Sequence, residues 1–114
     1  MKIAIPTKNH MGLEDTVSDA FDKAKTFTIV VCEDDKIVNV QIVDNTATLY
    51  EYGSGPIVVE MLADLKVDLV LALEIGPGVS KLLEHYNIRR ILVESGRRVK
   101  DTVEEGLTGQ DSRR

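Results

Sequence analysis

Apolar residues are nearly continuous over Val67–Leu73. A run of this length is typical of a strand that is covered on both faces, as central strands are in the sheets of α/β proteins. The corner Gly76–Gly78 ends this strand, and apolar residues then recur at helical spacing over Val79–Tyr86, which predicts an amphipathic helix. Because ligands bind beyond the carboxyl ends of strands in open α/β sheets, the segment Glu74–Gly78 is the first candidate site.

Other segments upstream also have the pattern of strands. Lys2–Pro6 is short and apolar, and we expect it to end at Pro6, because proline cannot donate a hydrogen bond to a sheet. Thr26–Glu33 is rich in β-branched residues and, after a tight turn at Asp34-Asp35, Lys36–Val43 returns along it. Apolar and polar residues alternate in this returning segment, which predicts an antiparallel edge strand with one face in water. The alternating sets are Val38, Val40 and Ile42, and Asn39, Gln41 and Val43.

Helices and one more strand complete the pattern. Gly53–Pro56 predicts the start of a helix that runs through about Lys66, and Ala20–Ala24 predicts a short helix. Ile88–Glu94 predicts a last strand, and Ser95–Gly109 ends in a last helix. These elements give the fold class α/β. We expect a ribonuclease H-like three-layer sandwich whose mixed five-stranded sheet has the order 3-2-1-4-5, with strand 2 antiparallel, flanked by helices.

Length and composition fit one globular domain. We place this domain at residues 1–109 of the 114, followed by a flexible tail at 110–114. Apolar residues make up 43% of the chain and charged residues 29%, which is ordinary globular usage. The formal net charge is −5 and there is no Trp. An acidic chain with so few stacking side chains disfavours a nucleic-acid-binding protein.

Cys32 is the single cysteine, so the chain forms no internal disulfide and lacks the thiolates of a structural zinc or four-cysteine iron–sulfur site. This cysteine usage favours a reducing compartment. Only a short apolar run precedes Pro6, and no stretch is long and apolar enough to span a membrane. We therefore expect a cytoplasmic protein without a signal peptide or a membrane segment.

Loops beyond the carboxyl ends of the strands are expected to form one crevice, from Thr7–Asp15, Asn45–Gly55 and Glu74–Gly78. Two of them contain Gly-rich corners that open a helix, where free backbone N–H groups can bind a phosphate or another small anion. The same glycines can instead serve only to permit sharp turns, and neither corner matches a P-loop or dinucleotide fingerprint. The predicted ligand-binding residues are Thr7, His10, Ser18, Asn45, Gly53, Ser54, Gly55, Gly76 and Gly78.

Side chains add to these backbone groups. Ser18 and Asn45 are predicted to hydrogen-bond the ligand directly. His10 is either one ligand of a bound group or a solvated loop residue, because histidine ligates metals in company with other ligands.

The sequence pattern does not place together the side chains that catalysis or metal binding requires. A nuclease of ribonuclease H type needs clustered carboxylates, but the first strand carries none, and Asp68 and Glu74 stand about 20 Å apart at opposite ends of one predicted strand. The two histidines, His10 and His85, are too far apart in the pattern to form a nucleophile–base pair. We expect no catalytic residues, no metal ligands and no enzyme activity.

Several short motifs occur in an order and spacing that resemble a known family. They are MKIAIPT at the start, Val17-Ser18 followed by Phe21 and Phe27, Asp44-Asn45, Gly53–Pro56, and Val67-Asp68 followed by Ile75-Gly76-Pro77. Over residues 1–109 the chain resembles the dinitrogenase iron-molybdenum cofactor biosynthesis family, small domains related to NifX and the C-terminal part of NifB. The resemblance implies the ribonuclease H-like fold and a non-enzymatic carrier that binds iron–sulfur or iron–molybdenum cofactor precursors.

A second interpretation stays open. Members of this family often read Ser-x-His-Phe-Gly-Arg-Ala, whereas this chain has Ala20 in place of the His and Asp22 in place of the Gly. Without such ligands the same fold would be a cofactor-free interaction module, pairing through an edge strand or through the loop with Tyr50 and Tyr52. The expected partner is therefore a small anion or metal cluster, or else a protein, including a second copy of the chain.

Overall fold

A mixed five-stranded sheet forms the centre of the computed structural model, which describes residues 1–112 and the side chains of residues 1–107. The strands are β1 (Lys2–Thr7), β2 (Thr26–Glu33), β3 (Lys36–Asp44), β4 (Leu69–Ala72) and β5 (Arg89–Leu92). The helices are α1 (Ser54–Asp64), α2 (Pro77–His85) and α3 (Val99–Ser112), with 3-10 turns η1 (Gly12–Glu14) and η2 (Thr46–Leu49). The order across the sheet is β3-β2-β1-β4-β5, with β2 antiparallel to both neighbours and β1, β4 and β5 parallel. The predicted strand order and directions are confirmed.

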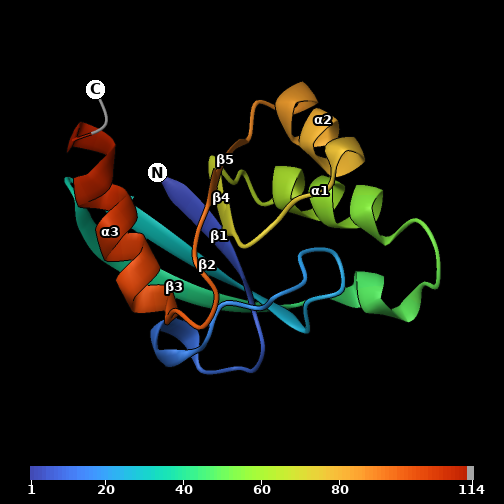
Figure 1. The fold of residues 1–114 in the computed structure, drawn as a ribbon, viewed down its shortest axis with the longest axis horizontal. Coiled ribbons are helices and arrows are strands. Elements are labelled where there is room, and N and C mark those ends of the chain that lie inside the picture. The colour runs from blue at the N-terminus through green and yellow to red at the C-terminus, as the bar shows by residue number, and fades with distance from the viewer. Residues whose placement is uncertain (113–114) are drawn as a thin grey trace.

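Two hydrophobic cores lie on opposite faces of the sheet, because successive side chains of a strand point in opposite directions. Ala4 of β1 belongs to the core under α1 and α2, whereas its neighbours Ile3 and Ile5 belong to the core under α3. Figure 1 shows α1 and α2 on one side of the sheet and α3 on the other. Helices on both faces explain why β1, β2 and β4 are apolar nearly throughout.

The first strand does not end at Pro6, as its sequence predicted, but continues to Thr7. The carbonyl oxygen of Pro6 accepts a hydrogen bond from the backbone N–H of Ser18, and Thr7 forms a bridge with Val17. The imide nitrogen of Pro6 thus lies on the side of β1 away from β2, because the N and O of one strand residue face the same side. Proline therefore removes no hydrogen bond from the β1–β2 ladder.

The predicted short helix at Ala20–Ala24 is wrong, since these residues form a turn. The Ser18 hydroxyl oxygen accepts from the backbone N–H of Ala20 at 3.2 Å, which favours a local turn over a helical cap. Phe21 is buried, and its ring packs edge-on against Phe27 with the centroids 5.5 Å apart. This aromatic contact holds the turn on the core without a helix.

The edge strand β3 departs from its predicted burial. Its position at the edge of the sheet is confirmed, but Val38 is 53% exposed and Ile42 38%, so neither alternating face is fully covered. The core under α3 is built from β1, β2 and β4, and only Ile37 of β3 packs against it. The pairing of β2 with β3 also shifts register between Val31 and Cys32, so a β-bulge near Val38 interrupts the alternation that the sequence predicted.

The last elements are also displaced from their predicted bounds. The strands β4 and β5 are shorter than the apolar runs that predicted them, and α3 begins at Val99, after a bridge between Arg98 and Thr16. The predicted tail at 110–114 falls partly on α3, which continues through Ser112, and partly on residues 113–114, which lie outside the described residues. No helix in the described part of the chain is long and apolar enough to span a bilayer.

Helix α1 ends in a left-handed residue that is not glycine. Lys66 has φ +63°, its N–H bonds the carbonyl of Ala63, and the next N–H, of Val67, bonds the carbonyl of Leu62. These two bonds form a Schellman motif, in which the left-handed position is usually glycine because a Cβ is unfavourable there.

We expect Lys66→Gly to raise the free energy of unfolding by about 1 kcal/mol, because it removes the Cβ from a left-handed residue. Chemical denaturation of both proteins measures the difference. Lys66→Ala is the matched control and should bring no such gain, since alanine keeps the Cβ. A gain of the same size with alanine would contradict the conformational explanation.

Candidate functional site

The two Gly-rich corners predicted to bind an anion meet in one pocket. Its volume is about 460 Å³, and it lies where α1 and α2 begin, beside the turn at Asp22 and Lys23. The pocket is lined by Asp22, Lys23, Glu51, Tyr52, Gly53, Ser54, Gly55, Pro56, Gly78, Val79 and Leu82. Four of the predicted site residues, Gly53, Ser54, Gly55 and Gly78, are therefore brought together.

Close contact between α1 and α2 requires glycine at position 55. A Cβ on Gly55 would lie 2.8 Å from Cγ2 of Val79, a separation that real Cβ atoms do not adopt. Gly55 is itself buried in the first turn of α1. Because Gly55 has no side chain, α2 can begin in contact with α1. This contact forms the wall between the two corners of the pocket.

The start of α1 is already occupied by a carboxylate of the protein. Gly53 precedes the helix with φ +76°, and the Ser54 hydroxyl donates a hydrogen bond of 2.6 Å to Oδ2 of Asp22. A carboxylate at a helix N-terminus is stabilised by the positive end of the helix dipole. Asp22 therefore takes the place that an external anion would have at α1.

The start of α2 is open by comparison. Its N-cap residue, Gly76, makes no side-chain hydrogen bond, and Pro77 in the first turn has no N–H. The N–H groups of Gly78 and Val79 belong to the first turn, where a helix offers no carbonyl partner. Residues 78 and 79 both line the pocket, so the first turn of α2 borders it.

Neither glycine at the start of α2 is required by conformation or packing. Gly76 has φ −65°, which any residue adopts, and a Cβ built on Gly76 or Gly78 would meet no atom within 4 Å. Gly78 lies inside the helix, where glycine is less stable than alanine by up to about 1 kcal/mol, whereas Gly76 is at the N-cap, where glycine is favoured over alanine. The absence of a Cβ at Gly78 leaves the backbone of this first turn unobstructed on the side of the pocket.

Asn45 does not line the pocket but stabilises the turn that contributes Asp22 to it. The side chain is 3% exposed; its amide donates to the carbonyls of Asp22 and Ala24 at 3.0 and 2.8 Å, and its oxygen accepts from the N–H of Ala47. These bonds fix the turn that carries Asp22 to Ser54. In this structure, Asn45 therefore positions the pocket wall rather than presenting free polar atoms to a ligand.

The remaining predicted residues lie apart from the pocket. Thr7 is fully buried and hydrogen-bonds the hydroxyls of Thr26 and Thr28. Ser18 bonds its own turn, as described above, and is nearly buried. His10 is exposed, and its Nε2 lies 2.6 Å from Oδ1 of Asp44, at the end of β3. Ligand binding by these three residues stays a prediction, and none of them lines the pocket with the glycines.

Several lining residues were not predicted from the sequence. Asp22 and Glu51 bring carboxylates to the pocket, and Lys23 brings an ammonium group whose Nζ donates to the carbonyl of Tyr50 at 2.6 Å. Tyr52 and Leu82 add apolar surface. The charges of the side chains do not make the pocket positive, so recognition of an anion would depend on the N–H groups of α2. Only Asp22 had a sequence signal, as the residue that replaces a glycine in the family pattern.

Side chains suited to holding iron directly are not grouped here. Among the described residues no three of His, Cys, Asp or Glu cluster as metal ligands would. Cys32 is 3% exposed and lines a different cavity, of about 470 Å³, with Met1 and Glu33 at the start of the sheet. Burial raises the pKa of the Cys32 thiol; the N-terminal ammonium group opposes this rise and Asp35 adds to it, and the net increase disfavours the thiolate that iron binds.

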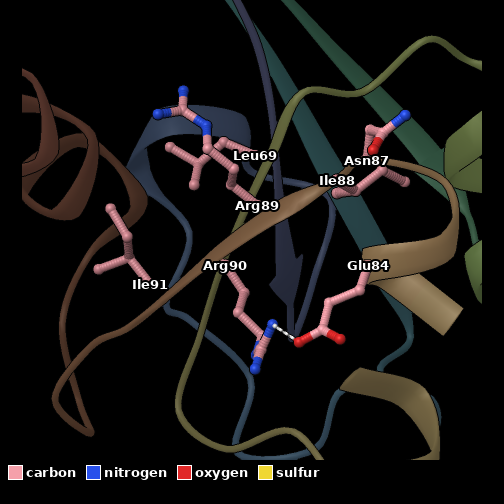
Figure 2. A pocket seen from close by; sticks show the side chains of 7 residues that line it. All are labelled: Leu69, Glu84, Asn87, Ile88, Arg89, Arg90 and Ile91. Atoms are coloured by element: carbon pink, nitrogen blue, oxygen red, sulfur yellow. Dashed lines mark hydrogen bonds and ion pairs between the residues drawn. The ribbon is translucent and has the colours of Figure 1, made fainter. Parts of the chain in front are cut away.

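Another cavity, of about 580 Å³, lies at β5, on the opposite edge of the sheet from β3 (Figure 2). Leu69, Asn87 and Arg89 line it, and a guanidinium nitrogen of Arg90 lies 3.5 Å from a carboxylate oxygen of Glu84. None of the predicted site residues lines this cavity. It is a surface of the β5 edge rather than part of the candidate site.

Comparison with known proteins connects this chain to a family. The family model described as dinitrogenase iron-molybdenum cofactor matches residues 1–109. An uncharacterised protein of Methanocaldococcus jannaschii is 30% identical over 88 residues, which are 77% of this chain and 70% of that protein.

Solved structures have the same fold. The apo form of the orange protein from Desulfovibrio gigas is similar with a TM-score of 0.87 at 24% identity, over 96% of this chain and 88% of that chain. A Thermotoga protein described as NifB-like, solved by NMR, is similar with a TM-score of 0.78 at 28% identity, over 96% and 89%.

We expect Gly55→Ala to lower the free energy of unfolding by about 1–3 kcal/mol, because the new methyl group overlaps Val79. Chemical denaturation measures the loss. In a Val79→Ala background the same substitution should cost much less, and Gly78→Ala, which meets open space, is the control without overlap. Equal costs of Gly55→Ala in both backgrounds would contradict this contact.

We expect native Cys32 to react with a disulfide reagent at pH 8 at least about tenfold more slowly than in the unfolded chain. The raised pKa keeps the thiol protonated in the folded state, so the native rate should climb only as the pH rises above the ordinary cysteine pKa. Labelling with and without concentrated guanidinium chloride measures both rates. Rapid native labelling at pH 8 would instead make Cys32 an available ligand.

Proposed function

The chain belongs to the dinitrogenase iron-molybdenum cofactor family, and we propose that it is a non-enzymatic carrier of an anionic iron–sulfur or iron–molybdenum cluster precursor in the cytoplasm. The observation that carries the proposal is the pocket in which Gly78 and Val79 present open N–H groups beside the first turn of α1. Its location beyond the carboxyl end of β4 is that of ligand sites in open α/β sheets. We also propose that the fold is ribonuclease H-like, without nuclease activity.

The cluster would be bound as an intact anion through hydrogen bonds, without protein side chains that coordinate its metal ions. Cluster sulfides accept hydrogen bonds from backbone N–H groups, and such bonds are a common way in which proteins stabilise clusters. A helix N-terminus adds favourable electrostatics for a negative group. The glycines at 76 and 78 let a bulky cluster approach the backbone, and Tyr52, Val79 and Leu82 supply apolar contact for its remaining surface.

An interaction module without a cofactor is the second candidate function. The loop between β3 and α1 exposes Leu49 and Tyr52 at 83% each and Tyr50 at 54%. Exposed aromatic side chains are enriched where proteins bind each other. This loop continues directly into Tyr52 and Gly53 of the pocket, so a protein partner bound there would also lie next to any cargo.

We expect the purified chain, treated anaerobically with iron and sulfide, with or without molybdate, to retain a coloured cluster in stoichiometric amount after desalting. Absorption spectra and metal analysis measure retention. Gly78→Ala should fold at least as stably as the wild type, because the added Cβ meets open space, yet retain several-fold less cluster. The matched control is Gly106→Ala in α3, whose Cβ would make only an ordinary contact with Leu71, and it should retain the wild-type amount.

Two results would contradict the carrier. Absence of retained metal in the wild type would favour the interaction module instead. Retention that survives Gly78→Ala but is lost with Cys32→Ala or His10→Ala would place the cluster on side-chain ligands away from the pocket.

A further inference from the structure

A groove of about 400 Å³ lies between α1 and the edge strand β3. Its apolar lining comes from Val43 of β3 and from a row on α1 formed by Ile57, Met61 and Leu65. These side chains pack against the core and are only partly buried, so apolar surface remains exposed along the groove. Residues of the row are four positions apart, and the row is about 12 Å long, which is two turns of a helix.

The other two lining residues are Glu60 and Asp64, both exposed acidic residues of α1. In the described part of the chain, no ion pair includes either carboxylate. The two stand four residues apart, where like charges repel, and Asp64 is the last residue of α1, where the negative end of the helix dipole repels it again. The groove therefore carries negative charge that is unfavourable for α1 and that a cation would compensate.

A strand is a poor occupant for this edge of the sheet. The β2–β3 pairing shifts register between Val31 and Cys32, and Asp44 at the end of β3 is bonded to His10. The outer edge of β3 is therefore not a regular ladder for another strand. A row of side chains at four-residue spacing is instead the ridge that packs between the side chains of a second helix. The groove thus fits a helix along α1, as in other complexes where an amphipathic helix binds an apolar groove.

We propose that this groove binds an amphipathic helix of a partner protein, whose apolar face is bordered by Lys or Arg residues. Apolar anchors of the partner cover Val43 and Met61, and its cations pair with Glu60 and Asp64. Methionine adapts its shape to different neighbours, which suits Met61 to a surface that receives a partner. The formal net charge of −5 also attracts a basic partner.

This groove is separate from the pocket at the start of α1 and α2, because the two share no lining residue. The proposal therefore does not depend on whether that pocket holds a cargo.

We expect a fluorescent peptide helix, with a face of leucines bordered by lysines, to bind the full chain saturably, as measured by fluorescence anisotropy. The same peptide with glutamates in place of the lysines should bind at least about tenfold more weakly. Asp64→Lys should weaken binding of the lysine peptide about fivefold, because it turns an attraction into a repulsion. This variant should fold at least as stably as the wild type, since a cation suits the C-terminal turn of a helix. Asp101→Lys, the same charge change on α3 at the other face of the sheet, is the matched control and should change binding less than about twofold.

The position of the peptide can be read from the methionine methyl groups by NMR after carbon-13 labelling. The chain has three methionines, and of these only Met61 lines the groove. The Met61 signal should shift during the titration, whereas that of Met11, which is 59% exposed, should not. The double variant Glu60→Lys/Asp64→Lys should reverse the preference and bind the glutamate peptide more tightly than the lysine peptide.

The proposal is overturned if the lysine peptide does not bind saturably, if the glutamate peptide binds the wild type equally well, or if Met11 shifts and Met61 does not. A Met61 signal that moves with protein concentration alone would also overturn it, because the occupant would then be a second copy of the chain.

Discussion

Contact between Gly55 and Val79 is the constraint on which the candidate site depends. It allows two helices that follow different strands to begin side by side. Two helix N-termini in proximity bring two partial positive charges together, which is unfavourable unless a negative group compensates. Asp22 supplies that group for α1 through its bond to Ser54, while α2 keeps an open first turn. The two helix ends therefore differ, because a carboxylate of the chain compensates α1 and none is bonded at the first turn of α2.

The position of the Asp22 carboxylate, which compensates the N-terminus of α1, is set by residues far from it in the sequence. Asn45 follows β3, yet its amide holds the carbonyls of Asp22 and Ala24, so the turn is fixed from the opposite side of the loop. Phe21 anchors the same turn in the core by its contact with Phe27. Removal of a buried amide with three satisfied hydrogen bonds would leave two carbonyls and one N–H unpaired, at a cost of about 1–3 kcal/mol for each unpaired buried group. Asn45 therefore belongs to the structure of the site even though it does not line it.

The sequence predicted the sheet well, because burial on two faces leaves a clear apolar pattern in β1, β2 and β4. It also predicted that the corners at Gly53–Gly55 and Gly76–Gly78 meet, and Gly53, Gly55 and Gly78 do line one pocket, whereas Thr7 and Ser18, expected to border the same crevice, do not line it. It could not identify Asp22 or Asn45 as partners, because hydrogen bonds across a loop leave no periodic signal. Nor did alternation in β3 reveal that Val38 and Ile42 are half-exposed, since a pattern records which face is apolar but not whether a helix reaches it.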